Sequence, residues 1–315
     1  MFDDAVMGVQ SLIKHSYNRS LIALIIVPGF EKPASGRICP VGSHRSCSLL
    51  YDPMHTWHWH TWNELPYLRC SLLEPWSHGF FTQQFWLRSP DELTKILHPT
   101  AQAYRVKQVH GNTVLTPSDV ETCESDEAPS ADGLITQQSH QAVWACSADC
   151  TPVLIADAVT GQVAAVHAGW RGTALKIVPQ AIDRLRAQGS QLPNLRVAMG
   201  PAIAGEVYQV SEHVAAEVGA TVVGVDPNDT TTLLRALDQL PNSPLLDDPE
   251  PGRVRLDVRR INALQLEQLG MSPEQVAIAP YCTYQTPDRF FSYRRSREKK
   301  AQWSGIVSQS MREQT

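Results

Sequence analysis

Residues 167–172, His-Ala-Gly-Trp-Arg-Gly, join two segments of opposite character, and this junction indicates the fold. The preceding residues 162–166 form an apolar run typical of a buried β-strand, and the pattern from Thr173 onward is that of a helix. The junction brings together the imidazole of His167, the cation of Arg171 and the unpaired N–H groups of a helix start, which favour an anion. Because sites in α/β folds are usually built at strand ends, we expect the chemistry of this protein here.

The composition is that of a folded protein with no feature of a nucleic-acid binder. The chain has 315 residues, of which 43% are hydrophobic and 19% charged, so it can bury a core. The net charge is −5, and no basic stretch is interleaved with aromatic residues. The basic cluster at 294–300 is short and interrupted by Glu298, which is typical of a solvated face, although a small anionic substrate stays open.

The cysteines and the apolar segments bear on the compartment. Seven cysteines are an odd number, and their spacing is unlike that of a secreted scaffold, so we expect a reduced, cytoplasmic protein. The apolar run at 21–27 is too short to cross a bilayer, so no membrane partner is expected. We expect a monomer or a weakly associating homo-oligomer.

Two segments near the N-terminus differ from the rest of the chain. Residues 1–53 contain scattered Pro, Gly, Ser and Arg without a sustained period, which predicts a poorly ordered extension, and Met54 is a possible true start. Residues 54–315 are then the catalytic domain. Within it, His58 and His60 resemble half of a copper site, but the alternating Trp residues around them favour an edge strand with Trp facing the core.

From Trp76 onward, strand and helix patterns alternate, which predicts a single mixed-sheet α/β domain of about 240 residues. Pro179 lies inside the first helical pattern and should kink or restart it. The expected strands are 104–109, 142–146, 152–156, 162–166, 196–199 and 275–279, and the expected helices are 173–187, 211–218, 233–240 and 258–269.

Three side chains at predicted strand ends are the strongest candidates for metal ligands. They are His110, Cys150 and His167, each next to small or turn residues. Two imidazoles and a thiolate suit zinc with an open fourth position, or copper, since both ions accept N and S ligands. The spacing alone is not diagnostic, because a lone histidine at a strand end is more often structural.

The sequence around these residues resembles a known family. The chain is similar to the YfiH-like family, also called the laccase-domain or multicopper polyphenol oxidase family, which is associated with purine nucleoside phosphorolysis. The resemblance covers about residues 76–310 and rests on several motifs in one order. These are Gln-Val-His-Gly (108–111), Ala-Asp-Gly-Leu-Ile-Thr (131–136), Ala-Asp-Cys-Thr-Pro-Val-Leu (148–154), Ala-Val-His-Ala-Gly-Trp-Arg-Gly-Thr (165–173), Met-Gly-Pro-Ala-Ile (199–203), Tyr-Gln-Val (208–210) and Phe-Phe-Ser-Tyr-Arg-Arg (290–295).

The resemblance implies a zinc-dependent purine nucleoside phosphorylase. The family's His-Cys-His metal site falls on His110, Cys150 and His167. The implied substrates are adenosine, inosine and 5′-methylthioadenosine, which would yield the free base and ribose 1-phosphate. A zinc ion that activates water could also support adenosine deamination, and the older copper label implies phenol oxidation.

Other residues have open roles. Arg171 suits phosphate through its guanidinium fork, and Arg294 is a second cation or a surface ion-pair partner. Asp149 is expected to orient His110 or His167, or else to close a turn. Asp132 binds ribose hydroxyls or serves as a turn residue. The expected role of Cys282 and Tyr208 is core packing, although Cys282 could line the pocket and Tyr208 could stack on a purine.

One segment departs from the family pattern. Family members usually continue His-Gly-Phe-Phe-Thr with an Arg and a glycine-rich loop, whereas residues 78–82 run here into Gln-Gln-Phe-Trp at 83–86. If that loop holds phosphate or substrate, the protein is slower or differently selective, and phosphorolysis is the activity most affected.

Three hypotheses stay open: the zinc-dependent nucleoside enzyme, a copper phenol oxidase and a non-catalytic zinc protein. Eleven histidines with one H-x-H pair exclude the usual four-copper layout, though not a single copper. A structural zinc site requires four ligands, and the sequence offers three good ones. The zinc deaminase signature is absent, as are the Walker A, G-x-G-x-x-G and G-x-S-x-G strings. We favour the first hypothesis.

Overall fold

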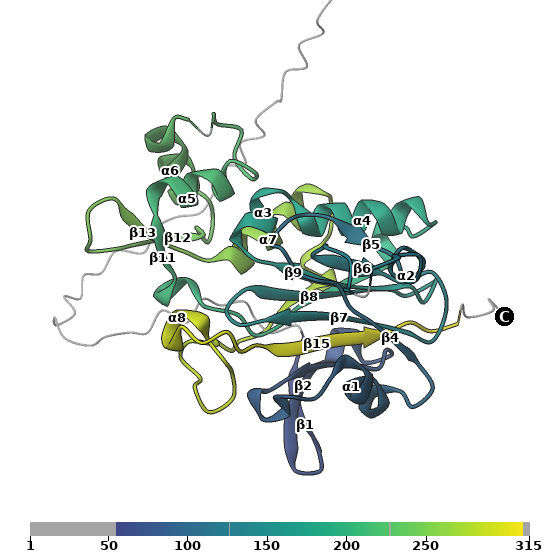
Figure 1. Cartoon of the computed structure of the whole chain (residues 1–315). Helices are drawn as coiled ribbons and strands as arrows, with labels where there is room; N and C mark the ends of the chain where they lie inside the picture. Colours follow the sequence, from purple (N-terminus) through teal and green to yellow (C-terminus); the bar gives the residue numbers. More distant parts are fainter. Residues whose placement is uncertain (1–54, 126, 227, 311–315) are drawn as a thin grey trace, which may run out of the picture. The chain divides into compact units, whose positions relative to one another are not determined.

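The structure is a computed structural model that describes residues 55–125, 127–226 and 228–310. The prediction of a poorly ordered extension over residues 1–53, with a possible start at Met54, lies outside these residues. The described chain is mixed α/β, with two six-stranded sheets and one three-stranded sheet, and helices beside them (Figure 1). The predicted fold class is therefore confirmed.

The first sheet joins the early strands to the last one. Its order is β1-β2-β3-β15-β7-β4, and only the pairing of β4 with β7 is parallel. Sequence-distant residues such as Gly305 and Trp144 are register partners within it. The strands are β1 (Trp57–Trp62), β2 (Leu65–Cys70), β3 (His78–Phe81), β4 (Gln102–Tyr104), β7 (Gln141–Ser147) and β15 (Gln302–Val307).

The second sheet carries the most deeply buried strands. Its order is β14-β10-β8-β9-β6-β5, and both β8 and β9 are buried along their whole length. The alternation of side chains along β8 explains this: Leu154 faces an inner cluster that also holds Val143 and Ile306, whereas Ile155 faces the opposite side with Leu266. The strands are β5 (Val114–Leu115), β6 (Gly133–Ile135), β8 (Thr151–Asp157), β9 (Val163–Ala168), β10 (Leu195–Met199) and β14 (Val276–Ile278).

A small antiparallel sheet, ordered β11-β13-β12, forms a separate cluster with buried residues of three helices, at 215–218, 233–237 and 258–261. Its strands are β11 (Gln209–Ser211), β12 (Leu245–Asp247) and β13 (Arg253–Leu256). Trp170 and Tyr208 pack against this cluster, so it lies beside the 167–172 junction.

The helices cover the sheets and connect their strands. The α-helices are α1 (Pro90–Leu97), α2 (Pro117–Glu121), α3 (Trp170–Ala174), α4 (Ile177–Ala187), α5 (Glu212–Gly219), α6 (Thr230–Asp238), α7 (Val258–Gln268) and α8 (Tyr293–Ser296). The 3₁₀ turns are η1 (Ser71–Leu73), η2 (Gln83–Phe85), η3 (Leu192–Asn194), η4 (Gly205–Val207) and η5 (Pro273–Gln275). None of the helices in the described ranges has the length and apolar character that crossing a bilayer requires.

Two sequence predictions of secondary structure are wrong in detail. The strand expected at 104–109 ends at Tyr104, because the side chain of Gln108 exchanges hydrogen bonds with the backbone of Cys146 at 2.6 and 2.7 Å and takes the place of a strand partner. The helix expected at 173–187, with a kink or restart at Pro179, is two helices that are separated earlier, by Lys176 in a left-handed conformation (φ 57°). Pro179 lies in the first turn of α4, where its missing N–H costs nothing.

The His- and Trp-rich segment forms the predicted edge strand. β1 is the outermost strand of its sheet and pairs only with β2 among the described strands. Trp57 packs against the inner cluster, whereas Trp59 is 37% exposed, so the Trp residues face the core only in part. His58 Nε2 is 2.7 Å from Thr56 Oγ1, and the cluster of metal-ligating side chains found in the described residues lies elsewhere.

His78, on β3, is expected to make stability depend on pH. Its side chain is fully buried: Nδ1 donates to Trp76 O, and Nε2 accepts from Cys70 N, each at 2.9 Å. Burial is the main reason why the pKa of His78 falls from 6.5 to about 4. The unfolded chain therefore takes up a proton below pH 6.5 while the folded chain does not, so stability is highest above pH 6.5 and is lost as pH falls toward 4.

The expected loss is up to about 3 kcal/mol in the free energy of unfolding across that window. Denaturant unfolding at pH 7.5, 6 and 5 measures it, with His78→Gln as the variant that removes this titration and His213→Gln, an exposed site on α5, as the control. An identical pH dependence in His78→Gln and in the unsubstituted protein contradicts the prediction.

Candidate metal centre

Three turns bring His110, Cys150 and His167 together. His110 lies in the loop between β4 and β5, Cys150 in the β7–β8 turn, and His167 near the end of β9. Their candidate ligand atoms all lie within 4.8 Å of one another. The two imidazole rings meet nearly edge to face, with centroids 4.9 Å apart and an interplanar angle of 79°. His167 is buried, Cys150 is half-buried and His110 is exposed, so the group is open on one side.

Asp132 holds two of these residues with one carboxylate. Its Oδ1 accepts hydrogen bonds from His167 Nδ1 and His110 N, each at 2.9 Å. Its Oδ2 accepts from the backbone N–H groups of Val109 (3.1 Å) and Gly111 (2.7 Å). The bond to Nδ1 leaves Nε2 of His167 as the free ring nitrogen, and the three backbone bonds fix a loop in which His110 has a φ of 61°.

Asp149 fixes the turn that carries Cys150. It has a φ of 90°, a left-handed conformation that its neighbours must hold in place. Its Oδ1 accepts from Thr283 Oγ1 and its Oδ2 from Arg294 N, each at 2.7 Å. The prediction that Asp149 orients an imidazole is therefore wrong, because Asp132 makes that bond. The alternative role, closing a turn, agrees with the geometry.

The charges favour a thiolate at Cys150. Burial raises the pKa of Cys150, but the imidazoles of His167 and His110 outweigh burial and lower it. Burial lowers the pKa of His167, but the Cys150 sulfur and the Asp132 carboxylate outweigh burial and raise it. For Asp132, hydrogen bonds from His167 and Gly111 outweigh the effect of burial and hold the pKa below its ordinary value. A metal ion bound between Cys150 and His167 would displace a proton from the His167 imidazole.

The donor set fits a four-coordinate soft or borderline metal ion. Zinc bonds of about 2.0 Å to nitrogen and about 2.3 Å to sulfur place two ligands of a tetrahedral ion roughly 3.5 Å apart. Donors within 4.8 Å of one another need to close by only about 1 Å to reach that arrangement. Two nitrogens and a sulfur leave one position vacant, which is the arrangement of catalytic zinc sites.

Gly169 leaves the space that this group of side chains needs. A Cβ at this position would lie 2.9 Å from Cys150 Sγ and 3.3 Å from His110 Cδ2. Any larger residue would therefore push two candidate ligands apart. This explains why a glycine follows the His-Ala pair at the end of β9.

Comparison with known proteins identifies the family. Residues 90–309 match the family described as "Multi-copper polyphenol oxidoreductase laccase". The chain belongs to this family. Among its relatives, "Purine nucleoside phosphorylase slr1573" of Synechocystis sp. is 52% identical over 256 residues, which is 80% of this chain and 97% of that protein. "Purine nucleoside phosphorylase ORF3" of Streptomyces griseus is 31% identical over 192 residues, which is 61% of this chain and 68% of that protein.

Two solved structures share the fold. The YfiH protein of Bacillus licheniformis superposes with a TM-score of 0.63 at 25% identity, covering 77% of this chain and 96% of that one. YlmD of Geobacillus stearothermophilus gives the same TM-score at 22% identity, covering 80% and 99%. The resemblance drawn from the sequence motifs is confirmed.

The remaining predicted residues lie around the centre in different ways. Arg171, in α3, is exposed and its Cζ lies 4.4 Å from the centroid of the Trp170 ring. Arg294 donates from Nη1 to Gln209 O at 2.8 Å, and its Cζ lies 4.8 Å from the centroid of the Tyr208 ring. The Arg294 side chain therefore has structural partners of its own, and its backbone N–H donates to Asp149.

Asp132 and Cys282 are both buried away from solvent. The Asp132 side chain has no exposed surface, and both of its oxygens are bonded, so no oxygen is accessible to a ribose hydroxyl. Cys282 is 7% exposed and accepts a hydrogen bond from Ala204 N at 3.3 Å, which agrees with the packing role expected from the sequence.

Sequence reasoning missed the role of Thr283 and left that of Tyr208 open. Thr283 donates to Asp149, and it follows Cys282, for which the sequence predicted packing with the pocket lining as the alternative. Burial, then the charge of Cys150, raise the pKa of Tyr208 to about 12, while the charge of Arg294 lowers it, so its phenol lies among the charges of the centre. Tyr208 opens the family motif at 208–210, whereas none of the family motifs includes Thr283, so the sequence offers no signal for its role.

Proposed function

We propose that this protein is a zinc-dependent purine nucleoside phosphorylase. The observation that carries the proposal is the convergence of His110, Cys150 and His167 within 4.8 Å, in a chain 52% identical to a relative named as a purine nucleoside phosphorylase. The proposed substrates are adenosine, inosine and 5′-methylthioadenosine. The products are the free base and ribose 1-phosphate, or its methylthio derivative.

In this proposal, His110, Cys150 and His167 would hold the metal ion. When bound, zinc supplies a Lewis acid beside the substrate and an open coordination position. Asp132 keeps His167 in the tautomer with Nε2 free and holds the His110 loop, as its four hydrogen bonds indicate. Gly169 keeps the approach to the sulfur clear.

The reaction needs a phosphate oxygen to attack the anomeric carbon as the bond to the purine breaks. The departing purine takes the electron pair of that bond and is stabilised when a proton or a hydrogen-bond donor meets it. Arg171 is the proposed phosphate-binding cation, because it is exposed beside the centre and its fork matches phosphate oxygens. Arg294 holds Tyr208 in place, and the Tyr208 phenol is the proposed donor and stacking surface for the purine.

Adenosine deamination is proposed as a side activity at the same centre, because a zinc ion held by these three residues would supply a Lewis acid that lowers the pKa of water. A second candidate function is oxidation of phenols with a single copper ion in the same His-Cys-His group. The description of the family and the N₂S donor set favour it, because copper accepts these ligands as zinc does. Within the described residues there is one such group of three, whereas a multicopper oxidase holds four copper ions.

Release of hypoxanthine from inosine, with and without phosphate, tests the reaction. We expect release that depends on phosphate and yields ribose 1-phosphate in equal amount. Equal release without phosphate means hydrolysis. Metal analysis of protein purified without added copper is expected to give zinc. Copper-loaded protein that oxidises phenols and leaves nucleosides unchanged replaces this proposal with the second candidate.

Arg171→Ala is expected to raise the KM for phosphate about tenfold, because one charge-assisted contact worth roughly 1.5 kcal/mol is lost. Metal content should not change, since Arg171 is not among the candidate ligands. Steady-state kinetics with phosphate as the varied substrate measures the effect, and Arg186→Ala on α4, which pairs with Asp183, is the matched control. Loss of metal from Arg171→Ala would assign this residue a structural role.

A further inference from the structure

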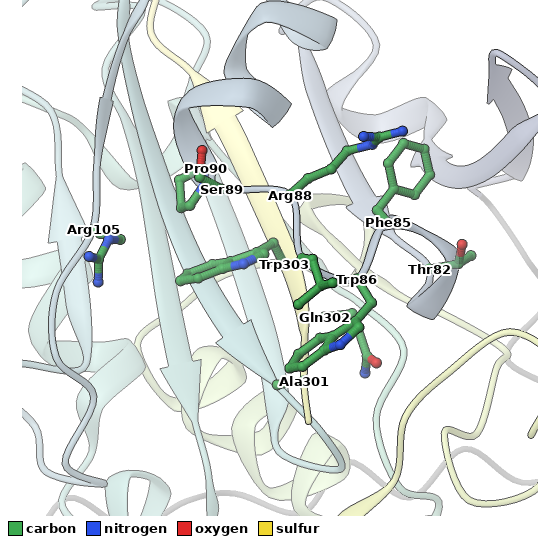
Figure 2. Close-up of a pocket in the computed structure, with 11 residues that line it drawn as sticks. Thr82, Phe85, Trp86, Arg88, Ser89, Pro90, Arg105, Ala301, Gln302 and Trp303 are labelled. Atoms are coloured by element: carbon green, nitrogen blue, oxygen red, sulfur yellow. The ribbon is translucent and has the colours of Figure 1, made fainter. Parts of the chain in front are cut away.

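A hollow lies apart from the metal centre. Its volume is about 250 Å³, and it is lined by Thr82, residues 85–90, Arg105 and residues 301–303 (Figure 2). Trp303 at this end of β15 packs against the cluster of Phe81, Phe85, Leu93 and Trp144, so the hollow opens on the side of the first sheet that α1 covers. None of the three candidate metal ligands lines it.

Two indoles form the flat walls of this hollow. Trp86 is 42% exposed, yet it is held in place by Phe291, whose ring meets it at 5.2 Å and 76°. Gln302 fixes Phe291 in turn, since its Oε1 accepts from Phe291 N at 2.8 Å. An exposed indole held on one side presents its other side to a ligand, and indoles contact planar rings favourably. Trp86 belongs to the segment that departs from the family pattern after Thr82.

The hollow is positively charged. Arg88 and Arg105 line it, and among the described residues no carboxylate does, although the net charge of the chain is −5. Arg88 is engaged with aromatic rings, because its Cζ lies 5.2 Å from the Trp62 ring and 6.0 Å from that of Phe85. Figure 2 shows the Arg88 side chain running toward Phe85, whereas the indole of Trp303 points toward Arg105. Arg105 is exposed and is therefore the cation available to a ligand.

We propose that this hollow binds a small planar aromatic anion. The ring lies against Trp86 and Trp303, and the anionic group meets the guanidinium of Arg105. The volume is just below the range of about 300 to 1,000 Å³ that is typical of sites for drug-sized ligands, so one or two fused rings fill it. This site is independent of the proposed function, because it shares no ligand residue with the metal centre.

Three indoles that differ only in charge test the proposal by isothermal titration calorimetry on the full chain. The probes are indole-3-acetate (anion), indole-3-acetamide (neutral) and tryptamine (cation). Indole-3-acetate is expected to bind about 5-fold more tightly than the amide, as one exposed ion pair allows, and tryptamine should bind most weakly. Equal affinities for the three probes, or no heat of binding at millimolar concentrations, overturn the proposal.

Variants assign the two contacts separately. Arg105→Gln should remove the preference for the acetate over the amide, and Arg253→Gln, which changes an exposed arginine elsewhere, should keep it. Trp86→Ala should weaken all three probes about 3- to 10-fold through the lost ring contact, whereas Trp59→Ala, another exposed indole, should not.

Cys150→Ala removes a candidate metal ligand and should leave the affinity for indole-3-acetate unchanged. If the acetate no longer binds to Cys150→Ala, its site is the metal centre and the proposal fails. The same conclusion follows if Arg105→Gln retains the full preference for the anion.

Discussion

Cys150→Ala is expected to lower the rate of phosphorolysis about 1,000-fold and to release most of the bound metal. The sulfur is one of the three candidate ligands of the metal ion. A metal ion stabilises the charge that develops in the transition state by several kcal/mol, and each 1.4 kcal/mol corresponds to about tenfold in rate. The measurements are inosine phosphorolysis and the zinc content of the purified variant.

Cys282→Ala is the matched control for this prediction. Cys282 is also a buried thiol, 7% exposed, but it packs against Ile203 and Ala204 and is not among the candidate ligands. It should retain metal and rate while losing some stability. A Cys150→Ala variant that keeps full activity would remove the thiolate from the proposed mechanism.

Asp132→Asn is expected to weaken zinc binding 10- to 100-fold and to destabilise the fold by about 3 kcal/mol. Asparagine has nearly the same shape, but its NH₂ group replaces one of the two accepting oxygens. That group would face two N–H donors, either those of Val109 and Gly111 or those of His110 and His167. Competition with a zinc chelator measures the affinity, and denaturant unfolding of the metal-free protein measures the stability.

Asp157→Ala, which removes the accepting oxygen, separates the two effects. Asp157 is also fully buried, and its Oδ1 accepts from Val159 N and Thr160 N, but it is not among the candidate metal ligands or bonded to them. This variant should lose stability and keep its zinc affinity. If Asp132→Asn also keeps its zinc affinity, then Asp132 supports only the fold and does not position the ligands.

The sequence predicted the buried strands well because their signal is local. β8 and β9 are apolar runs bounded by turn residues, and both were predicted within two residues of their ends. A kink or restart of this helix was predicted at Pro179, but the break lies at Lys176, which carries no sequence signal for its left-handed backbone. The two sheets were not predicted either, because the pairing of β15 with β7 joins residues far apart in the chain.

The sequence likewise indicated some features of the candidate site and not others. Motifs and strand ends indicated His110, Cys150 and His167, and these three residues do converge. The partners of Asp132 and Asp149 could not be predicted from the sequence. Both carboxylates adjoin turns, and only the backbone path decides that Asp132 reaches His167 whereas Asp149 reaches Thr283 and Arg294.

The bonds of Asp149 to Thr283 and Arg294 have a consequence for biosynthesis. During translation the two histidines and the cysteine leave the ribosome well before residues 283–294, which hold the turn carrying the sulfur in its left-handed conformation. β15, the register partner of β7 just before that turn, is made later still. A nascent chain therefore lacks a finished ligand set, and we expect the ion to be acquired after the last strand is released.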